Sequence, residues 1–412
     1  MKRYLVILLS LVFVLGTVSF AVADDGGMDS VRAMQPGAKV MLGGDMRVRG
    51  TWKKNNDFDK DTINPKNDNA YYDQRFRLKI KGEAGNGVSA NVRLYMANSV
   101  KWDGAANSCT GCIKIDYAYV TVPVSTFTVN AGLMKTYYGN AFMNNENIPG
   151  QMGDQFDERR ETIEVIGTFE TVTIKAFTSK IADTFDSVTG DENLKDFNDY
   201  GVMLVADLGE IEAGGIVIYH HDNRETIPGT GNDDGTDISI YAKGAMQNIK
   251  VGAEVVFLTG DINKDSADNT PLGFMAYAET TVGAIGVRAD AAFSMNGYQA
   301  SYSYEPTLLI GTTQQTALTD FTSFDDENAF LIAASANTDV MENVNALARV
   351  AYWNAKPTGG GDSLGLLELD GEILVQIAKN ARYFIEAAWG NPNDELGEDS
   401  AFVLANRVEL FF

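Results

Sequence analysis

Hydrophobic and polar residues alternate one by one along most of the chain after residue 38. Met46 and Val48 alternate with Asp45, Arg47 and Arg49. The same period of two recurs in other segments, at 75–84, 88–96, 249–257, 285–293, 344–352 and 367–377. Successive side chains of a β-strand point to opposite faces, so each segment has one apolar and one charged face. The pattern predicts an all-β protein.

The lengths of the segments and of their connections narrow the fold class. Each segment has roughly ten residues, the length that a tilted strand needs to cross a bilayer. Very short connections, such as Gly85-Asn86-Gly87, Gly209-Glu210 and Gly283-Ala284, alternate with long polar ones. The long stretches are 53–71, 98–112, 138–159, 180–199, 221–236, 260–273, 297–326, 355–366 and 391–399. We therefore predict that residues 38–412 form a transmembrane antiparallel β-barrel of about eighteen strands, or sixteen as the alternative, with short periplasmic turns and long external loops.

Aromatic residues support this orientation. Trp52, Tyr72, Tyr95 and Trp353 are among those near the expected external strand ends, and Phe127 is among those near the periplasmic ends. Two aromatic belts are expected where a membrane protein passes from lipid to water. We therefore expect such side chains to mark the two membrane interfaces.

The first residues have the features of a secretory signal peptide. Lys2 and Arg3 precede an uncharged apolar run over 4–18, and Ala21-Val22-Ala23 offers small residues before a cleavage point at Asp24. The run is short for a membrane-spanning helix, which needs about 20 apolar residues. We predict that residues 1–23 are removed, that 24–37 form a short lead-in, and that the mature chain resides in the bacterial outer membrane.

Composition excludes several classes of protein. The chain has 56 Asp and Glu against 33 Lys and Arg, a formal net charge of −23. Such an acidic chain is a poor partner for nucleic acid. Hydrophobic residues make up 45% of the sequence, which is too many for a disordered acidic polymer. The 40 glycines and nine prolines suit a large β protein with many turns.

Two short motifs are candidates for special chemistry. Cys109 and Cys112 lie close together in a chain bound for an oxidising compartment, which favours a local disulfide. A redox or metal role is the alternative, but no histidine lies nearby. Asp57, Asp59 and Asp61 are similar to the opening of a calcium loop, although a threonine replaces the glycine and no glutamate closes the motif. We predict no cofactor and no dedicated metal site, and only loose binding of divalent cations by acidic loops.

The C-terminal strand carries a family resemblance. Val408, Leu410 and Phe412 share one face of a final strand that ends in phenylalanine. This strand resembles the signal by which the barrel assembly machinery recognises Gram-negative outer-membrane proteins. Residues 116–120 and 129–135 also look like segments of the bacterial porin superfamily, without indicating a subfamily. The resemblance implies a passive diffusion channel for small hydrophilic solutes or ions, surrounded by lipid and lipopolysaccharide, with a homotrimer as a common assembly.

The resemblance also implies a constriction loop. In such porins the loop after the fifth strand folds into the lumen, and here that loop is 138–159. An ordinary external loop with a solvated acidic face is the alternative. The acidic residues of this loop are Glu146, Asp154, Asp157 and Glu158.

Basic residues gather on the face expected to line the lumen. If the first two strands pair across the 53–71 loop, Arg49 can face Arg75 and Arg47 can face Arg77. Like charges directly opposite one another destabilise a sheet unless acids, anions or water screen them, and a water-filled lumen with an acidic inserted loop provides that screening. The residues predicted to line the pore are Arg47, Arg49, Arg75, Arg77, Lys79 and Arg93. Glutamates on other strands also appear on this face, which leaves a general pore and a specific anion channel both open.

Two other functions are kept as alternatives. The barrel could be a sheath or scaffold for a partner protein, such as a periplasmic electron carrier. It could also be an outer-membrane hydrolase built on His220 or His221, the only two histidines. Adjacent residues of a strand point to opposite faces, so at most one of them can face the lumen. We predict no catalytic residues.

Overall fold

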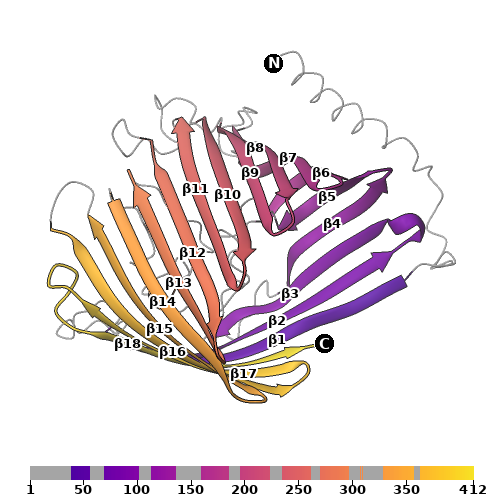
Figure 1. Cartoon of the computed structure of the whole chain (residues 1–412). Coiled ribbons are helices and arrows are strands. Elements are labelled where there is room, and N and C mark those ends of the chain that lie inside the picture. Colours follow the sequence, from indigo (N-terminus) through magenta and orange to yellow (C-terminus); the bar gives the residue numbers. More distant parts are fainter. Residues whose placement is uncertain are drawn as a thin grey trace.

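The computed structural model describes residues 39–55, 69–101, 113–135, 159–184, 195–222, 234–260, 270–296, 328–356 and 362–412, together with Thr307 and Leu309. The described residues form eighteen β-strands and one short 3-10 turn, Gly85–Gly87 (Figure 1). The strands are β1 (Lys39–Lys54), β2 (Asn69–Glu83), β3 (Ser89–Lys101), β4 (Lys114–Val124), β5 (Phe127–Lys135), β6 (Arg159–Phe169), β7 (Val172–Thr184), β8 (Lys195–Asp207), β9 (Ile211–Asp222), β10 (Gly235–Met246), β11 (Ile249–Gly260), β12 (Leu272–Val282), β13 (Ile285–Met295), β14 (Asn328–Met341), β15 (Val344–Lys356), β16 (Leu364–Ala378), β17 (Ala381–Pro392) and β18 (Ala401–Phe411).

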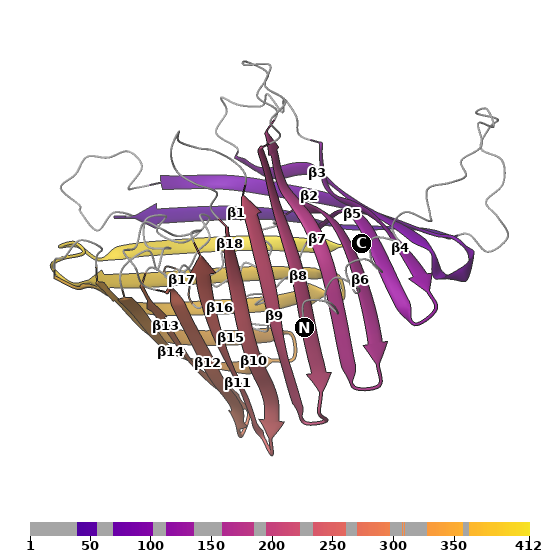
Figure 2. The ribbon, with the colours of Figure 1, turned by 90° about the horizontal axis from the view of Figure 1, so that it is seen from above.

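The strands close into a barrel. Each strand pairs antiparallel with its neighbours in the sequence, and β1 also pairs with β18. Figure 2 shows β18 lying between β1 and β17. Closure leaves no sheet edge without a partner, which is the condition for placing strands in lipid. The prediction of eighteen strands is confirmed, and the alternative of sixteen is wrong.

Connections of two lengths alternate along the barrel, as the sequence predicts. Two residues separate β4 from β5, β6 from β7, β10 from β11 and β12 from β13. Ser125, Glu170 and Gln247 have positive φ angles of 56°, 49° and 58° in three of these turns, the left-handed backbone that tight hairpins require. The long connections all follow odd-numbered strands, so they all leave the same end of the barrel.

The distribution of apolar and charged side chains over the two faces of the sheet is the reverse of that in a soluble protein. Large apolar side chains point outward and are exposed, such as Leu42 at 70% and Ile240 at 57%. Charged side chains are buried on the inner face, such as Arg47 at 1% and Glu368 at 0%. This distribution matches a lipid-facing exterior and a polar interior. No helix among the described residues is long and apolar enough to cross a membrane.

The aromatic belts need a correction. Trp52 and Tyr72 are exposed on the outer face, as an interfacial belt requires. Tyr95 and Trp353 are instead buried, at 3% and 2% exposure. Alternation explains the difference, because Tyr95 lies two residues from Arg93 and therefore on the same inner face. The placement of these two residues in a lipid-facing belt is wrong.

Part of the inner wall is apolar. A cluster of buried residues, which we call the inner apolar cluster, extends over β12 to β18 and includes one residue of the connection between β13 and β14. Its members are Met275, Ala292, Leu309, Ala329, Leu331, Ala333, Ala351, Trp353, Ala355, Leu366, Ala388, Ala401 and Val403. The barrel interior therefore has a charged sector and an apolar sector.

Several predicted segments lie outside the described residues. They are the signal peptide (1–23), the lead-in (24–37) and the cysteine pair Cys109 and Cys112.

Candidate solute pathway

The pairing of β1 with β2 sets the arrangement of the basic residues. Arg47 lies opposite Arg75, Arg49 opposite Asp73, and Asp45 opposite Arg77. The predicted facing of Arg49 with Arg75 and of Arg47 with Arg77 is therefore wrong by two residues. A shift of two keeps each side chain on its face but changes its partner. The observed register brings an aspartate beside the arginines, which relieves the repulsion that the predicted register would leave.

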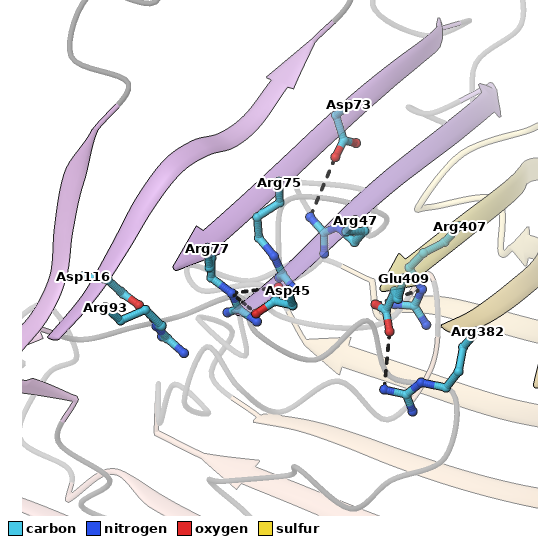
Figure 3. Close-up of polar contacts among 10 residues, drawn as sticks. All are labelled: Asp45, Arg47, Asp73, Arg75, Arg77, Arg93, Asp116, Arg382, Arg407 and Glu409. Atoms are coloured by element: carbon cyan, nitrogen blue, oxygen red, sulfur yellow. Dashed lines mark hydrogen bonds and ion pairs between the residues drawn. The ribbon is translucent and has the colours of Figure 1, made fainter. Parts of the chain in front are cut away.

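Asp45 binds two arginines of β2. Its Oδ1 accepts a hydrogen bond from Arg75 Nη2 at 3.1 Å. Arg77 Nε donates to Oδ1 and Oδ2 of the same carboxylate at 3.0 and 2.9 Å. All three side chains are buried, and Figure 3 shows the two guanidinium groups converging on this one carboxylate.

Asp73 likewise interacts with two arginines, further along the same pair of strands. Arg49 Nε donates to Asp73 Oδ2 at 2.8 Å, and Arg47 Nη2 lies 3.7 Å from Asp73 Oδ1. The aspartate comes from β2 and the arginines from β1, which is the reverse of the arrangement at Asp45. Each aspartate is thus shared between two arginines.

An irregularity in β4 adds Arg93 on β3 to these inward-facing arginines. We call Arg47, Arg49, Arg75, Arg77 and Arg93 the arginine wall. The register between β3 and β4 shifts after Arg93, which lies opposite Tyr117 while Leu94 lies opposite Ile115. Asp116 is the extra residue, and such a bulge redirects a side chain. As a result Asp116 forms a buried ion pair with Arg93, while the Arg93 guanidinium also lies 4.8 Å from the centre of the Tyr117 ring.

Lys79 differs from the other predicted pore-lining residues. It lies opposite Arg93, but its side chain is exposed while the arginines are buried. Lys79 is nearer than these arginines to the short-turn end of the β2–β3 hairpin. It belongs to the same face of the sheet as the arginines.

The ion pairs continue across the barrel seam to β18. Arg407 lies opposite Arg49, and Glu409 lies opposite Arg47. Arg407 Nε is 3.5 Å from Glu409 Oε1, and Arg407 Nη2 is 3.4 Å from Glu386 Oε1 on β17. Figure 3 shows Arg407 and Glu409 on the same side of the sheet as Arg47, Arg75 and Arg77. Period-two alternation assigns Glu386 and Glu409 to this face, but the closeness of β18 to β1 depends on closure of the barrel, which neither strand alone indicates.

The charges on this part of the inner wall are unequal. Among the described inward residues of β1 to β4 that form these pairs, five are arginines (Arg47, Arg49, Arg75, Arg77, Arg93) and three are aspartates (Asp45, Asp73, Asp116). A surface with more cations than anions raises the local concentration of anionic solutes. Charged side chains that ring a narrow aqueous passage select among permeating ions.

The predicted constriction loop lies outside the described residues except for its last residue, Arg159. Glu146, Asp154, Asp157 and Glu158 are among the residues not described, so their place opposite the arginines stays a prediction. The acidic motif at Asp57, Asp59 and Asp61 also lies outside. Within the described ranges, no group of three or more His, Cys, Asp or Glu side chains is arranged to hold a metal ion.

Comparisons with known proteins find one family model and several solved structures to which this chain is similar. The family model for phosphate-selective porin O and P matches residues 46–149. No curated protein matches the chain.

Similar solved structures come from Pseudomonas aeruginosa. The outer-membrane protein OpdK has a TM-score of 0.58 at 11% identity, covering 90% of this chain and 98% of its own. OprD has a TM-score of 0.57 at 12% identity, with 90% and 94% coverage. OpdL has a TM-score of 0.57 at 10% identity, with 90% and 98% coverage. At these identities the likeness concerns the fold.

The family match covers β1 from Met46 onward and all of β2 to β5, which include the five arginines but not Asp45, and the structural likeness covers 90% of the chain. Together they show that the chain shares the barrel fold of these outer-membrane proteins and that its first strands are similar to a family of porins.

Proposed function

We propose that this protein is a passive diffusion channel for small hydrophilic solutes, in which the arginine wall gives small anions an advantage over cations. The observation that carries the proposal is the sharing of Asp45 and Asp73 by two arginines each. The description of the matching family names phosphate selectivity, and a small oxyanion suits the bidentate geometry of guanidinium groups.

We also propose that the barrel has no catalytic role. His220 faces inward and His221 does not share that face, as strand alternation requires. The Nδ1 of His220 lies 2.6 Å from Asp199 Oδ1, and its Nε2 lies 2.9 Å from Asp237 Oδ2. A Ser-His-Asp triad needs one of these nitrogens to contact a serine. The contacts therefore favour a structural ion-pair network over a hydrolase.

The proposed channel function also implies an orientation and partners for the barrel in the membrane. The short turns would face the periplasm and the long connections the cell exterior, next to lipopolysaccharide. The barrel assembly machinery would recognise the C-terminal strand through Val408, Leu410 and Phe412. A homotrimer is the assembly that we propose for the membrane.

Conductance in a planar lipid bilayer tests the proposal. We expect stable ion-conducting steps from the purified mature protein. Under a potassium chloride gradient, the zero-current potential should have the sign of chloride preference. A protein that inserts but does not conduct would support the alternative of a sheath for a partner protein. Preference for potassium would contradict the role given to the arginines.

A further inference from the structure

His220 lies between two carboxylates on the inner wall of the barrel. Its Nδ1 is 2.6 Å from Asp199 Oδ1 on β8, and its Nε2 is 2.9 Å from Asp237 Oδ2 on β10. The residue opposite His220 on β10 is Gly235, which has no side chain, and Asp237 follows it by two positions on the same face. Both ring nitrogens therefore face carboxylate oxygens.

These two contacts require two N–H groups. An ionised carboxylate only accepts hydrogen bonds, and a neutral imidazole has one N–H, whereas the imidazolium has two. In the neutral form, one ring nitrogen would direct its lone pair at a carboxylate oxygen within hydrogen-bond distance. The geometry matches a doubly protonated His220.

An arginine completes this charged network. Arg160 on β6 forms an ion pair with Asp199. On β7, between these two strands, the inward residue opposite Asp199 is the uncharged Ser179. Among the described residues, the charged side chains of the network are thus Arg160, Asp199, His220 and Asp237. With His220 doubly protonated, two cations balance two carboxylates, and without that proton one carboxylate charge is left uncompensated.

The network lies near the external end of the barrel. His220 is close to the end of β9, which one of the long connections follows. β9 is nine strands away from β18 in either direction around the barrel, so the network faces the seam of β1 and β18 across the interior. The Asp237 side chain is 33% exposed, while that of Asp199 is fully buried. A change of charge at His220 therefore reaches the solute pathway next to an exposed carboxylate.

We propose that His220 is a further selectivity-determining residue of the solute pathway. As an imidazolium it cancels one carboxylate charge at the external mouth, and the loss of its second proton in alkaline solution lowers the preference for anions. The inference rests on the proposed channel function. Its physical basis is that a charge on the wall changes the local concentration of permeating ions through its field.

Nuclear magnetic resonance measures the charge state without reference to conduction. The chain contains only two histidines, so labelling their ring nitrogens with nitrogen-15 gives two sets of signals from the protein in detergent. His220→Gln removes one set and thereby assigns it. We expect the His220 signals at neutral pH to show two protonated nitrogens. A neutral ring, with the proton on Asp199 or Asp237 instead, would overturn the proposal.

Zero-current potentials under a potassium chloride gradient measure the effect on selectivity. From about pH 5 to about pH 10, the range in which protein histidines change charge, we expect the wild-type ratio of chloride to potassium permeability to fall by roughly twofold. His220→Gln should have the lower ratio throughout. His220→Arg, which keeps its charge over this range, should have the higher one. His221→Gln is the matched control on the outer face and should keep the wild-type change.

Asp237→Asn provides a second test if the His220 variants do not fold. It removes one carboxylate charge from the same network, so the ratio of chloride to potassium permeability at neutral pH should rise. An unchanged ratio in this variant, or a pH-dependent change as large in His220→Gln as in the wild type, would overturn the role of His220. A wild-type protein that does not conduct would overturn the channel function instead, whatever charge state the resonance measurement gives.

Discussion

At the scale of single residues, the shared aspartates explain how so many arginines are accommodated on one wall. Asp45 and Asp73 each lie between two guanidinium groups, within hydrogen-bond or ion-pair distance. A buried cation without a partner is strongly unfavourable, and a carboxylate that serves two cations reduces this cost for both. The aspartates therefore stabilise the wall while leaving the arginines in excess.

Replacing Asp45 by asparagine should separate its effect on stability from its effect on ion selectivity. Arg75 and Arg77 would lose their shared carboxylate, and we expect the free energy of unfolding to fall by about 3 kcal/mol. Selectivity should move further toward anions, because one negative charge leaves the wall. Urea unfolding in detergent and the zero-current potential measure the two changes. Asp207→Asn, at the exposed end of β8, is the control, and equal effects of both variants would contradict the role of Asp45.

Reversing two charges of the wall should reverse its preference. In the double variant Arg75→Glu and Arg77→Glu, we expect the zero-current potential under a salt gradient to shift toward that of a cation-selective pore. Lys250→Glu, at the exposed short-turn end of β11, should leave the potential nearly unchanged. Arg75→Gln provides a milder variant if the double one does not fold. An unshifted potential in a folded variant would mean that these arginines lie away from the narrow part of the pathway.

The sequence predicts the face of each arginine but not its partner. Period-two alternation assigns Arg47, Arg49, Arg75 and Arg77 to one side with little ambiguity. The pairing register depends on how many residues of the first long connection extend the strands. A shift of two residues preserves the alternation, and so the pattern cannot detect it. The bulge at Asp116 is similarly hidden, since it arises from the fit between two strands.

At the scale of elements, the seam between β1 and β18 depends on one glycine. Gly44 N donates to Phe412 O at 2.8 Å, and Phe412 N donates to Gly44 O at 3.1 Å. The Phe412 ring stacks on Phe76 at 5.9 Å between ring centroids. A Cβ atom at Gly44 would lie 2.3 Å from the Arg77 carbonyl oxygen and 2.7 Å from the Phe412 ring. The absence of a side chain at Gly44 is therefore a condition for closing the barrel around Phe412.

A valine at Gly44 should weaken the seam. We expect a loss of about 2 kcal/mol in stability from overpacking and a smaller fraction of protein that resists unfolding in sodium dodecyl sulfate at room temperature. Gly82→Val on β2 is the matched control, because a Cβ atom there has no neighbour within 4 Å. Similar losses in both variants would show that a general effect of adding a branched side chain to this sheet, and not the seam, accounts for the loss.

Deleting Phe412 tests the C-terminal strand as an assembly signal. We expect the amount of protein in the outer membrane to fall more steeply than the stability of the same variant refolded in detergent, because recognition precedes closure. Immunodetection in membrane fractions and unfolding in detergent give the two quantities. Normal surface levels of the shortened protein would contradict the proposed signal, even if the loss of the Gly44 contacts lowered its stability.

At the scale of the whole molecule, closure makes the barrel one cooperative unit. Each strand has two neighbours through backbone hydrogen bonds, and the first strand pairs with the last. We predict that the mature protein is rich in β structure in detergent and migrates differently in gel electrophoresis before and after boiling. A helical circular-dichroism spectrum, or full solubility without detergent, would contradict the barrel.

The global features of this barrel follow from the sequence better than its interior contacts. Strand length and the alternation of short and long connections sufficed for eighteen strands. The burial of Trp353 and Tyr95 differs from the prediction, since position near a strand end does not decide which face a residue occupies. The contact of Leu309 with Glu368 joins residues 59 positions apart. No local pattern marks that pair, because it depends on packing across the interior.

The meeting of β1 and β18 has a consequence for the order of the chain itself. Because the strand number is even, β1 begins and β18 ends at the same end of the barrel, and Asp45 lies opposite Phe411. The position of the chain ends therefore depends only on which neighbouring strands a connection joins, and the arrangement of the strands does not depend on it. Joining the two ends through a short linker and opening the chain between Gly209 and Glu210, in a turn at that same end, should give a circular permutant with the same cylinder of strands.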